Sequence, residues 1–528
     1  MPIFKKQSLQ SPTVTVVSDA GVSLDPTEEY EQLRVKGVGI HTSEGENFNN
    51  TIFGRDSAVS ARELLQQHPD LAHDVILTLA RLQGVRYRRL SDEEPGRIHH
   101  EDRDFSAWHA TLGKKIPLLA ASILWGGTLE HMTTYQSIDS TPLFVILVAE
   151  YVAIDPSILE KKVMRHDRKM VTIRQSMIEA AGWVSRHVTD EGLVVIPKHN
   201  VFGLTHQTWK DSPNAYIHRD GSMLRVLKPI AYLEVQCLSV DALRHAAAVI
   251  GDEDQEAASI WKLQADAVVK ATIDRFWMQD VQFFASAIDR TKQGIERVCH
   301  VIQSDPGWML TTSFFDGLAE SDRRRYITGI VRQMMSPHFI TDVGIRTRSL
   351  QYAKLLEIID YHGVYTSWPI DTYMFSKGLR RQGLPGLAHQ LETRVLNAVT
   401  LADDSYEFFY VLEDGSAVIS PLAARVKKQG ARALPTHMYP DEVIAWSVAL
   451  VMRLEYGRAR DQYRAVVEPK TWQADLEAEV LPTITDISQI KTHDELQEQY
   501  RAQPLVFLDN KRGNRLLRNI VVGVYLDR

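Results

Sequence analysis

The stretch Ser140-Thr-Pro-Leu-Phe-Val-Ile-Leu-Val148 places a helix start signal directly before a strongly apolar run. Ser140 is a good N-terminal cap, and Pro142 falls near the first helical turn, where a missing N–H removes no hydrogen bond. The sequence therefore predicts a helix over residues 140–152.

Outward from this helix, apolar residues at three- and four-residue spacing recur from about residue 53 to residue 456. Loops rich in Gly, Pro, Asp and Trp separate them. Twelve helices are predicted, over residues 57–66, 70–86, 111–124, 140–152, 169–187, 228–249, 254–277, 306–317, 320–334, 371–382, 384–400 and 440–456. The strand-like segments are short and cover residues 13–17, 193–197, 283–287 and 520–525.

The arrangement of these helices favours one all-α architecture. No self-similarity at 34 or 40 residues stands out, which argues against a superhelical repeat array. Helices joined by alternating short and long loops suit an (α/α)6 toroid, in which the long loops, with their short β excursions, meet at one mouth. We predict an N-terminal extension at 1–50, the barrel at 51–460 and a C-terminal appendage at 461–528.

Composition narrows the class of protein. The 528 residues are 44% hydrophobic, which is ample for a substantial core. The net charge is −7 and no basic stripe occurs, which argues against nucleic acid or an anionic membrane as the main partner. Cys237 and Cys299 give neither a zinc spacing nor a disulfide framework. With no apolar signal-like N-terminus and no window of transmembrane length, we expect a cytoplasmic protein without metal or cofactor.

Two loops carry the candidate chemistry, His206-Gln-Thr-Trp-Lys-Asp-Ser212 and Asp403-Asp-Ser-Tyr-Glu-Phe-Phe409. Each places a carboxylate, Asp211 or Glu407, among aromatic residues, and acid-assisted cleavage of a glycosidic bond requires such a pair. The alternative for Asp211 is a capping residue in an exposed loop, and Glu413 and Asp414 are rivals of Glu407.

The first loop also holds residues suited to binding a sugar. Trp209 offers a flat face for stacking on a pyranose ring, and Gln207 adds a polar group. Burial and a second carboxylate nearby would hold Asp211 protonated, whereas Lys210 would oppose that shift in pKa.

Further polar residues lie where loops meet predicted helices. A carboxylate accepts hydrogen bonds from vicinal hydroxyls, and an adjacent arginine can fix its orientation. Most of these residues could equally be helix caps, and metal binding by the neighbouring His99 and His100 is disfavoured because such neighbours point opposite ways. The candidates are Arg55, Asp56, His100, Glu101, Asp139, Trp368 and Asp371.

In this order, the motifs resemble the amylo-α-1,6-glucosidase domain of glycogen-debranching enzymes. They are also similar to processing α-glucosidases and mannosylglycerate hydrolases of the same (α/α)6 superfamily. The matching pieces are Thr51-Ile-Phe-Gly-Arg-Asp-Ser57, Glu94-Pro-Gly-Arg-Ile-His-His-Glu101, Ser137-Ile-Asp-Ser-Thr-Pro-Leu-Phe144, Gln207-Thr-Trp-Lys-Asp-Ser212, Leu233-Glu-Val-Gln236, Gly344-Ile-Arg-Thr347, Tyr361-His-Gly363, Ser367-Trp-Pro-Ile-Asp371, Gly378-Leu-Arg-Arg-Gln-Gly383 and Glu407-Phe-Phe409. Together they span about residues 50–456.

The resemblance implies an inverting hydrolase with an Asp general acid and a Glu general base. Asp211 takes the acid role, although Thr208 replaces the Gly that precedes the Trp in the family motif, and Glu407 takes the base role on a partial match. In an inverting pair the carboxyl groups stand about 6.5–9.5 Å apart. The residues that the resemblance assigns to the sugar are Arg55, Asp56, Trp209, Lys210, Trp368 and Asp371.

One departure bears on the substrate. Debranching enzymes carry large N-terminal regions that engage polymeric glucan, whereas about fifty residues precede the first motif here. This difference suggests a small α-glucoside or α-linked oligosaccharide and leaves glucose and mannose open. A sugar phosphorylase, a non-catalytic carbohydrate-binding toroid and an epimerase with paired histidines are the alternatives, and the sequence gives no oligomeric state.

Overall fold

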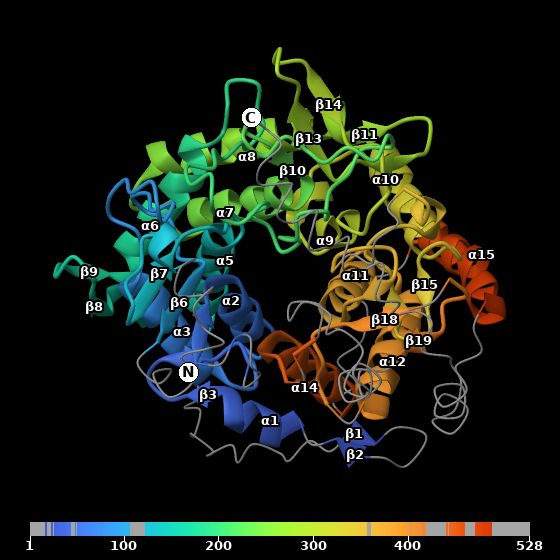
Figure 1. Cartoon of the computed structure of the whole chain (residues 1–528), viewed down its shortest axis with the longest axis horizontal. Helices are drawn as coiled ribbons and strands as arrows, with labels where there is room; N and C mark the ends of the chain where they lie inside the picture. Colours follow the sequence, from blue (N-terminus) through green and yellow to red (C-terminus); the bar gives the residue numbers. More distant parts are fainter. Residues whose placement is uncertain are drawn as a thin grey trace.

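The fold is helix-rich, with short strands in the connections (Figure 1). The computed structural model describes residues 16–17, 23–24, 26–43, 48, 50–105, 122–355, 361–402, 404–411, 413–418, 440–441, 443–459 and 470–487. Among these residues, no helix is both long enough and apolar enough to cross a membrane.

Among the described residues, six helices form an inner ring (Figure 1). They are α2 (Gly54–Glu63), α5 (Ser140–Val152), α7 (Leu233–Ile250), α9 (Pro306–Met309), α11 (Pro369–Arg381) and α14 (Ala445–Ala459). Each contacts the next in this order, and α14 contacts α2. The contacts therefore close on themselves.

The remaining helices pack outside this ring (Figure 1). They are α1 (Pro26–Leu33), α3 (Pro69–Arg81), α6 (Ile173–Arg186), α8 (Gln255–Phe276), α10 (Glu320–Met334), α12 (Pro385–Ala402) and α15 (Thr471–Ile487). From α1 to α14 outer and inner helices alternate along the chain, and α15 packs against α10 and α12.

Hydrophobic patterning explains which helices lie inside. Every residue of α5 except Glu150 and Val152 is buried, as expected for a helix covered on all sides. In the outer helix α8, the buried residues Trp261, Ala265 and Val268 recur at spacings of three and four, which leaves a second face for solvent. One continuous hydrophobic core joins the two layers.

The strands form small antiparallel sheets of two or three strands. The sheets are β1–β2 (Val16–Val17, Ser23–Leu24), β3–β4 (Arg34–Val35, Gly39–Ile40), β5–β6–β7 (Thr51–Phe53, Glu101–Asp104, His131–Thr134), β8–β9 (Lys162–Met164, Met170–Thr172), β10–β13–β14 (Ala231–Tyr232, Ala287–Arg290, Glu296–Val298), β11–β12 (Trp277–Met278, Phe283–Phe284), β15–β16 (Ile340–Thr341, Gly344–Ile345) and β17–β18–β19 (Thr366–Ser367, Phe409–Val411, Ala417–Val418). Several of these strands run directly into inner helices, as β5 does into α2, so the sheets position the helix starts.

Most predicted helices agree with the structure. The helices at 140–152 and 320–334 have the predicted bounds, and most others agree within a few residues. The single helix predicted at 306–317 is wrong, because Thr312 is extended and caps a separate 3₁₀ turn, Ser313–Phe315. The last helix begins at Ala445 instead of residue 440, and α1 and α15 were not predicted.

Other predicted elements agree with the structure only in part or lie outside the described residues. Residues 193–197 form isolated bridges instead of a strand. Residues 111–121 of the helix predicted at 111–124 lie outside the described residues, as does the strand predicted at 520–525. Helix α1 precedes the predicted boundary at residue 51 and packs against α14.

Candidate active site

A cavity of about 540 Å³ lies where inner helices begin. Eight of the residues predicted for the site line it: Arg55, Asp56, His100, Glu101, Trp209, Asp211, Trp368 and Glu407. Twelve further residues complete the lining: Thr42, Phe48, Phe53, Arg103, Trp125, Leu204, Ser212, Pro213, Tyr361, His362, Ile444 and Trp446. Asp211 and Glu407, which are 196 positions apart in the printed sequence, therefore share one cavity.

Asp211 lies in the loop before α7, and 27% of its side chain is exposed. Burial, and the negative charges of Asp139 and Asp56, raise its pKa to about 7, although the guanidinium of Arg55 acts in the opposite direction. The nearest guanidinium nitrogen of Arg55 is 4.0 Å from Asp211 Oδ2. At neutral pH a large fraction of Asp211 therefore carries a proton that it can donate.

Arg55 and Asp56 occupy the first turn of α2, directly after β5. This junction requires glycine, because a Cβ on Gly54 would lie 2.2 Å from the carbonyl oxygen of His99. Arg55 Nη1 donates to Asp139 Oδ2 at 3.0 Å, and burial raises the pKa of Asp56 to about 6. Neither Arg55 Nε nor Asp56 Oδ2 has a hydrogen-bond partner within the described structure.

Glu407 precedes β18 and is 3% exposed. Its Oε1 accepts a short hydrogen bond from the hydroxyl of Tyr361, and its Oε2 accepts the backbone N–H of Asp441 at 3.3 Å. Burial and the charge of Asp441 raise the pKa of Glu407 well above its usual range, while the two hydrogen bonds act in the opposite direction. The charge of Asp211 also raises this pKa, so the two carboxyls influence each other's protonation.

The rival carboxylates lie elsewhere. Glu413 accepts a hydrogen bond from the hydroxyl of Tyr365 at 3.0 Å, and Asp414 Oδ1 accepts the backbone N–H of Ser416 at 2.9 Å. Neither Glu413 nor Asp414 lines the cavity. The structure therefore favours Glu407 among the three candidates.

The aromatic residues are less open than the sequence suggests. Trp209 is 1% exposed and stacks on Trp308 at a centroid distance of 5.5 Å. His362 and Phe408 both stack on Trp368, at 4.7 Å and 5.2 Å. Trp368 is 1% exposed and packs against both rings, so little of its surface is open to a sugar.

Four predicted sugar ligands do not line the cavity: Asp139, Gln207, Lys210 and Asp371. Lys210 Nζ donates to Asp305 Oδ2 at 2.8 Å, and Asp371 Oδ1 accepts the indole N–H of Trp308 at 2.8 Å. Gln207 bonds Asp92 and Arg97, and Asp139 holds Arg55. These partners come from distant segments, so sequence spacing could not reveal that the four side chains are already paired.

His100 and Glu101 enter the cavity from β6 and the residue before it. Burial lowers the pKa of His100 well below its usual range, so the ring is neutral. Glu101 forms an ion pair with Arg103, whose Nε lies 2.5 Å from Glu101 Oε1. Among the described residues, no group of three His, Cys, Asp or Glu side chains is arranged to hold a metal ion.

Several lining residues were not predicted. Tyr361 belongs to the segment Tyr361-His-Gly363, which the family resemblance includes, so this motif could have indicated that Tyr361 lies in the site. Trp446, at the start of α14, lies 5.9 Å from the guanidinium of Arg55. Trp125 and Arg103 sit in no motif, so nothing in the sequence distinguishes them.

Residues 230–415 match the family model of the mannosylglycerate hydrolase MGH1-like glycoside hydrolase domain. This stretch of the chain is therefore similar to mannosylglycerate hydrolase-like glycoside hydrolases. The matched residues include Tyr361, Trp368 and Glu407, whereas Arg55 and Asp211 precede them. No curated protein sequence matches the chain.

Solved structures of the same fold include the GH63 mannosylglycerate hydrolase from Thermus thermophilus, in complex with Tris or with glucose. In both comparisons the identity is 15%, the TM-score is 0.51, and the match covers 82% of this chain and 99% of the other. A rhamnosidase from Klebsiella oxytoca with rhamnose bound is 10% identical with a TM-score of 0.45, over 85% of this chain and 66% of the other. The family-model match over residues 230–415 confirms the predicted resemblance to mannosylglycerate hydrolases.

Proposed function

We propose that this glycoside hydrolase is an inverting enzyme that cleaves a small α-glucoside or α-linked oligosaccharide, and that its closed ring of helices is an (α/α)6 toroid. The observation that carries the proposal is the cavity shared by Asp211 and Glu407. Asp211 is half-buried with a pKa of about 7, and Glu407 is buried and hydrogen-bonded. Two such carboxyls can divide the roles of acid and base.

In this mechanism Asp211 donates its proton to the glycosidic oxygen, and Glu407 removes a proton from the water that attacks the opposite face of the sugar ring. The base must be ionised when water attacks. Burial and the charge of Asp441 oppose ionisation of Glu407, whereas the Tyr361 hydroxyl and the Asp441 N–H stabilise its carboxylate. The active form is therefore the one in which Asp211 is protonated and Glu407 is ionised.

Polar groups that make no hydrogen bond support binding of a glycone near Asp211. Asp56 Oδ2, Arg55 Nε and the indole N–H of Trp209 have no hydrogen-bond partner within the described structure, although Arg55 Nε and Asp56 Oδ2 form an ion pair at 3.8 Å. A hydroxyl group both donates and accepts, so sugar hydroxyls can satisfy a carboxylate oxygen and an N–H group side by side. We assign these three groups to the sugar.

The rest of the cavity favours an uncharged leaving group. The half-exposed residues Phe48, Trp125, Leu204 and Pro213 are all apolar or aromatic. The two arginines among the described lining residues are each in ion pairs, Arg55 with Asp139 and Arg103 with Glu101. A negatively charged aglycone such as glycerate would have to compete with these carboxylates, so we favour a neutral aglycone.

Hydrolysis of a panel of small substrates tests the proposal. The panel contains α-glucosides and α-mannosides with neutral aglycones, together with mannosylglycerate. We expect turnover of a neutral α-glucoside, with NMR showing the β-anomer of the free sugar first. Initial release of the α-anomer would contradict inversion, and preference for mannosylglycerate would contradict the neutral aglycone.

The same assay separates the alternatives. A phosphorylase would turn over only with inorganic phosphate and would release a sugar phosphate. The acidic surroundings of Glu407, with Asp441 adjacent, disfavour a phosphate at that position. A protein that binds these sugars without turnover under any condition would be a non-catalytic carbohydrate-binding toroid.

A further inference from the structure

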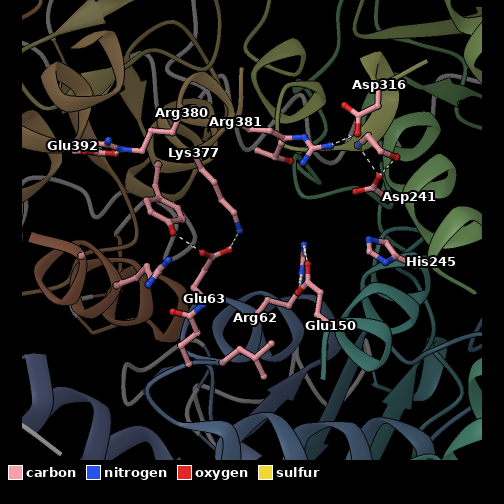
Figure 2. Close-up of a pocket in the computed structure, with 17 residues that line it drawn as sticks. Arg62, Glu63, Glu150, Asp241, His245, Asp316, Lys377, Arg380, Arg381 and Glu392 are labelled. Atoms are coloured by element: carbon pink, nitrogen blue, oxygen red, sulfur yellow. Dashed lines mark hydrogen bonds and ion pairs between the residues drawn. The ribbon is translucent and has the colours of Figure 1, made fainter. Parts of the chain in front are cut away.

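A second cavity, of about 660 Å³, lies among the inner helices and contains none of the residues that line the candidate active site. It is lined by residues from the later parts of these helices, including Arg62 of α2, Glu150 of α5, His245 of α7 and Lys377 of α11 (Figure 2). Arg453 of α14 also lines it. No predicted site residue is among them.

The two cavities lie toward opposite ends of the ring. Seven residues separate Arg55 in the first turn of α2 from Arg62 in its last turn, which corresponds to about 10 Å along the helix axis. Nine residues separate Trp368, at the start of α11, from Lys377, which corresponds to about 13 Å. A ligand in the second cavity would therefore not touch the reacting bond.

Charges of both signs line the second cavity in equal number, with five basic and five acidic side chains besides His245. Arg62 holds Glu150 through two hydrogen bonds of 2.7 and 2.9 Å. Lys377 and the hydroxyl of Tyr373 each donate to Glu63 at 2.5 Å. The lining is thus polar but close to electrically neutral.

Several polar atoms in this cavity remain available to a ligand. Arg62 Nη1 has no acceptor among the described residues, and Lys377 uses a single N–H for Glu63. Asp241 Oδ1 accepts two hydrogen bonds from Ser313, which leaves Oδ2 open. His245 makes no hydrogen bond to the described part of the chain and points toward the central space in Figure 2.

We infer that this second cavity binds an uncharged polyhydroxy compound, such as a monosaccharide or disaccharide. Each hydroxyl of such a ligand can donate to Asp241 or Glu150 and accept from Arg62, Lys377 or His245. The volume lies within the usual range for small-molecule sites. A mixed set of donors and acceptors without excess charge matches a neutral sugar.

The same features disfavour an anion. The basic side chains are balanced by carboxylates, and the later ends of the inner helices carry partial negative charge. A phosphate would have to approach Glu63, Glu150 and Asp241. The donors are therefore better matched by hydroxyl groups than by an ionised ligand.

Equilibrium binding of glucose, mannose and maltose tests this site, in the full chain with Asp211→Asn so that nothing is hydrolysed. In that background His245→Trp places a bulkier ring in the cavity without removing an ion pair, and His245→Ala keeps the space but removes one hydrogen-bonding group. The control is His389→Trp, because His389 is exposed on α12 and lies outside both cavities. The melting temperature of each variant reports whether it is folded.

We expect the control to bind one more equivalent of sugar than His245→Trp. We expect His245→Ala to weaken that binding about three- to tenfold, the value of one hydrogen bond. Equal stoichiometry in folded His245→Trp and the control would overturn the inference, as would displacement of the sugar by inorganic phosphate. The result does not depend on hydrolysis, so failure of the proposed activity would leave this test intact.

Discussion

The two ends of the helix ring contain similar side chains in opposite electrostatic states. At the end where the inner helices begin, burial raises the pKa values of Asp211 and Asp56 to about 7 and about 6. At the other end, burial would also raise the pKa of Glu63, but Lys377, Arg62 and the Tyr373 hydroxyl lower it. Glu150 is held ionised in the same way by Arg62.

This difference separates proton transfer from simple binding. A carboxyl whose pKa lies near the working pH can give or take a proton, whereas a carboxylate fixed by Arg or Lys remains ionised and serves as an acceptor. Basic side chains in the last turn also complement the negative ends of the helix dipoles, as Arg62 does in α2 and Arg380 in α11. This difference agrees with the proposed catalytic site at the first end and the proposed sugar-binding cavity at the second.

The largest expected effect is on activity when the acid is removed. Asp211→Asn keeps the shape of the side chain but cannot donate the proton, so we expect kcat to fall about 10²–10⁴-fold. Steady-state kinetics with the best α-glycoside of the panel measures the loss. Asp70→Asn, an exposed aspartate at the start of α3, is the matched control and should keep its activity. Near-normal turnover of Asp211→Asn would exclude Asp211 as the acid.

The same substitution, Asp211→Asn, should lower activity but raise the stability of the fold at alkaline pH. The pKa of Asp211 is 3.8 when unperturbed and about 7 in the fold, so between these values the folded state binds the extra proton and stability falls as pH rises. Asparagine does not ionise, so the Asp211→Asn variant should not lose stability as the pH rises. Thermal unfolding should therefore show Asp211→Asn more stable than the parent at pH 8, by on the order of 2 kcal/mol, and similar to it near pH 4. A parent protein with no such pH-dependent difference would contradict the raised pKa.

At the second end, removal of a cation should destabilise the fold. Arg62→Met leaves Glu150, which is 30% exposed, without its two hydrogen bonds, and we expect a loss of about 1–2 kcal/mol in urea unfolding at pH 7. Because the fold lowers the pKa of Glu150, the stabilisation by the Arg62–Glu150 pair is lost as the pH falls through the folded-state pKa of Glu150. Arg332→Met breaks an exposed pair with Glu479 and should cost a few tenths of a kcal/mol at most. Equal losses of stability in Arg62→Met and Arg332→Met would show that the Arg62–Glu150 pair stabilises the fold no more than an exposed pair does.

The smallest expected effect concerns the base. Asp441→Asn removes a negative charge that raises the pKa of Glu407, so Glu407 should ionise at lower pH. The acidic limb of the kcat/KM profile should move down by up to about one pH unit, while the alkaline limb, set by Asp211, should move less. Asp441→Glu keeps the charge and serves as the control. An upward shift of the acidic limb would contradict this role of Asp441.

The sequence predicted those parts of the site that lie in recognisable motifs. The Trp-Lys-Asp run at 209–211 and the aromatic run around Glu407 identified the two carboxyls that line the cavity. The family resemblance assigned Lys210 to the sugar, but Lys210 is paired with Asp305, 95 residues away in the sequence. Such long-range pairing decides which polar residues remain available, and no local pattern reports it.

The sequence by itself determined the helical body and the candidate acid and base, because hydrophobic spacing and short motifs act over a few turns of chain. Only the tertiary structure decided which side chains face a cavity and which are already paired, and it alone brought Arg62, Glu150, His245 and Lys377 into one space. Those four residues carry no motif; their proximity follows from closing the ring. The pKa values of Asp211 and Glu407 arise in the same way, since burial and neighbouring charges exist only in the folded chain.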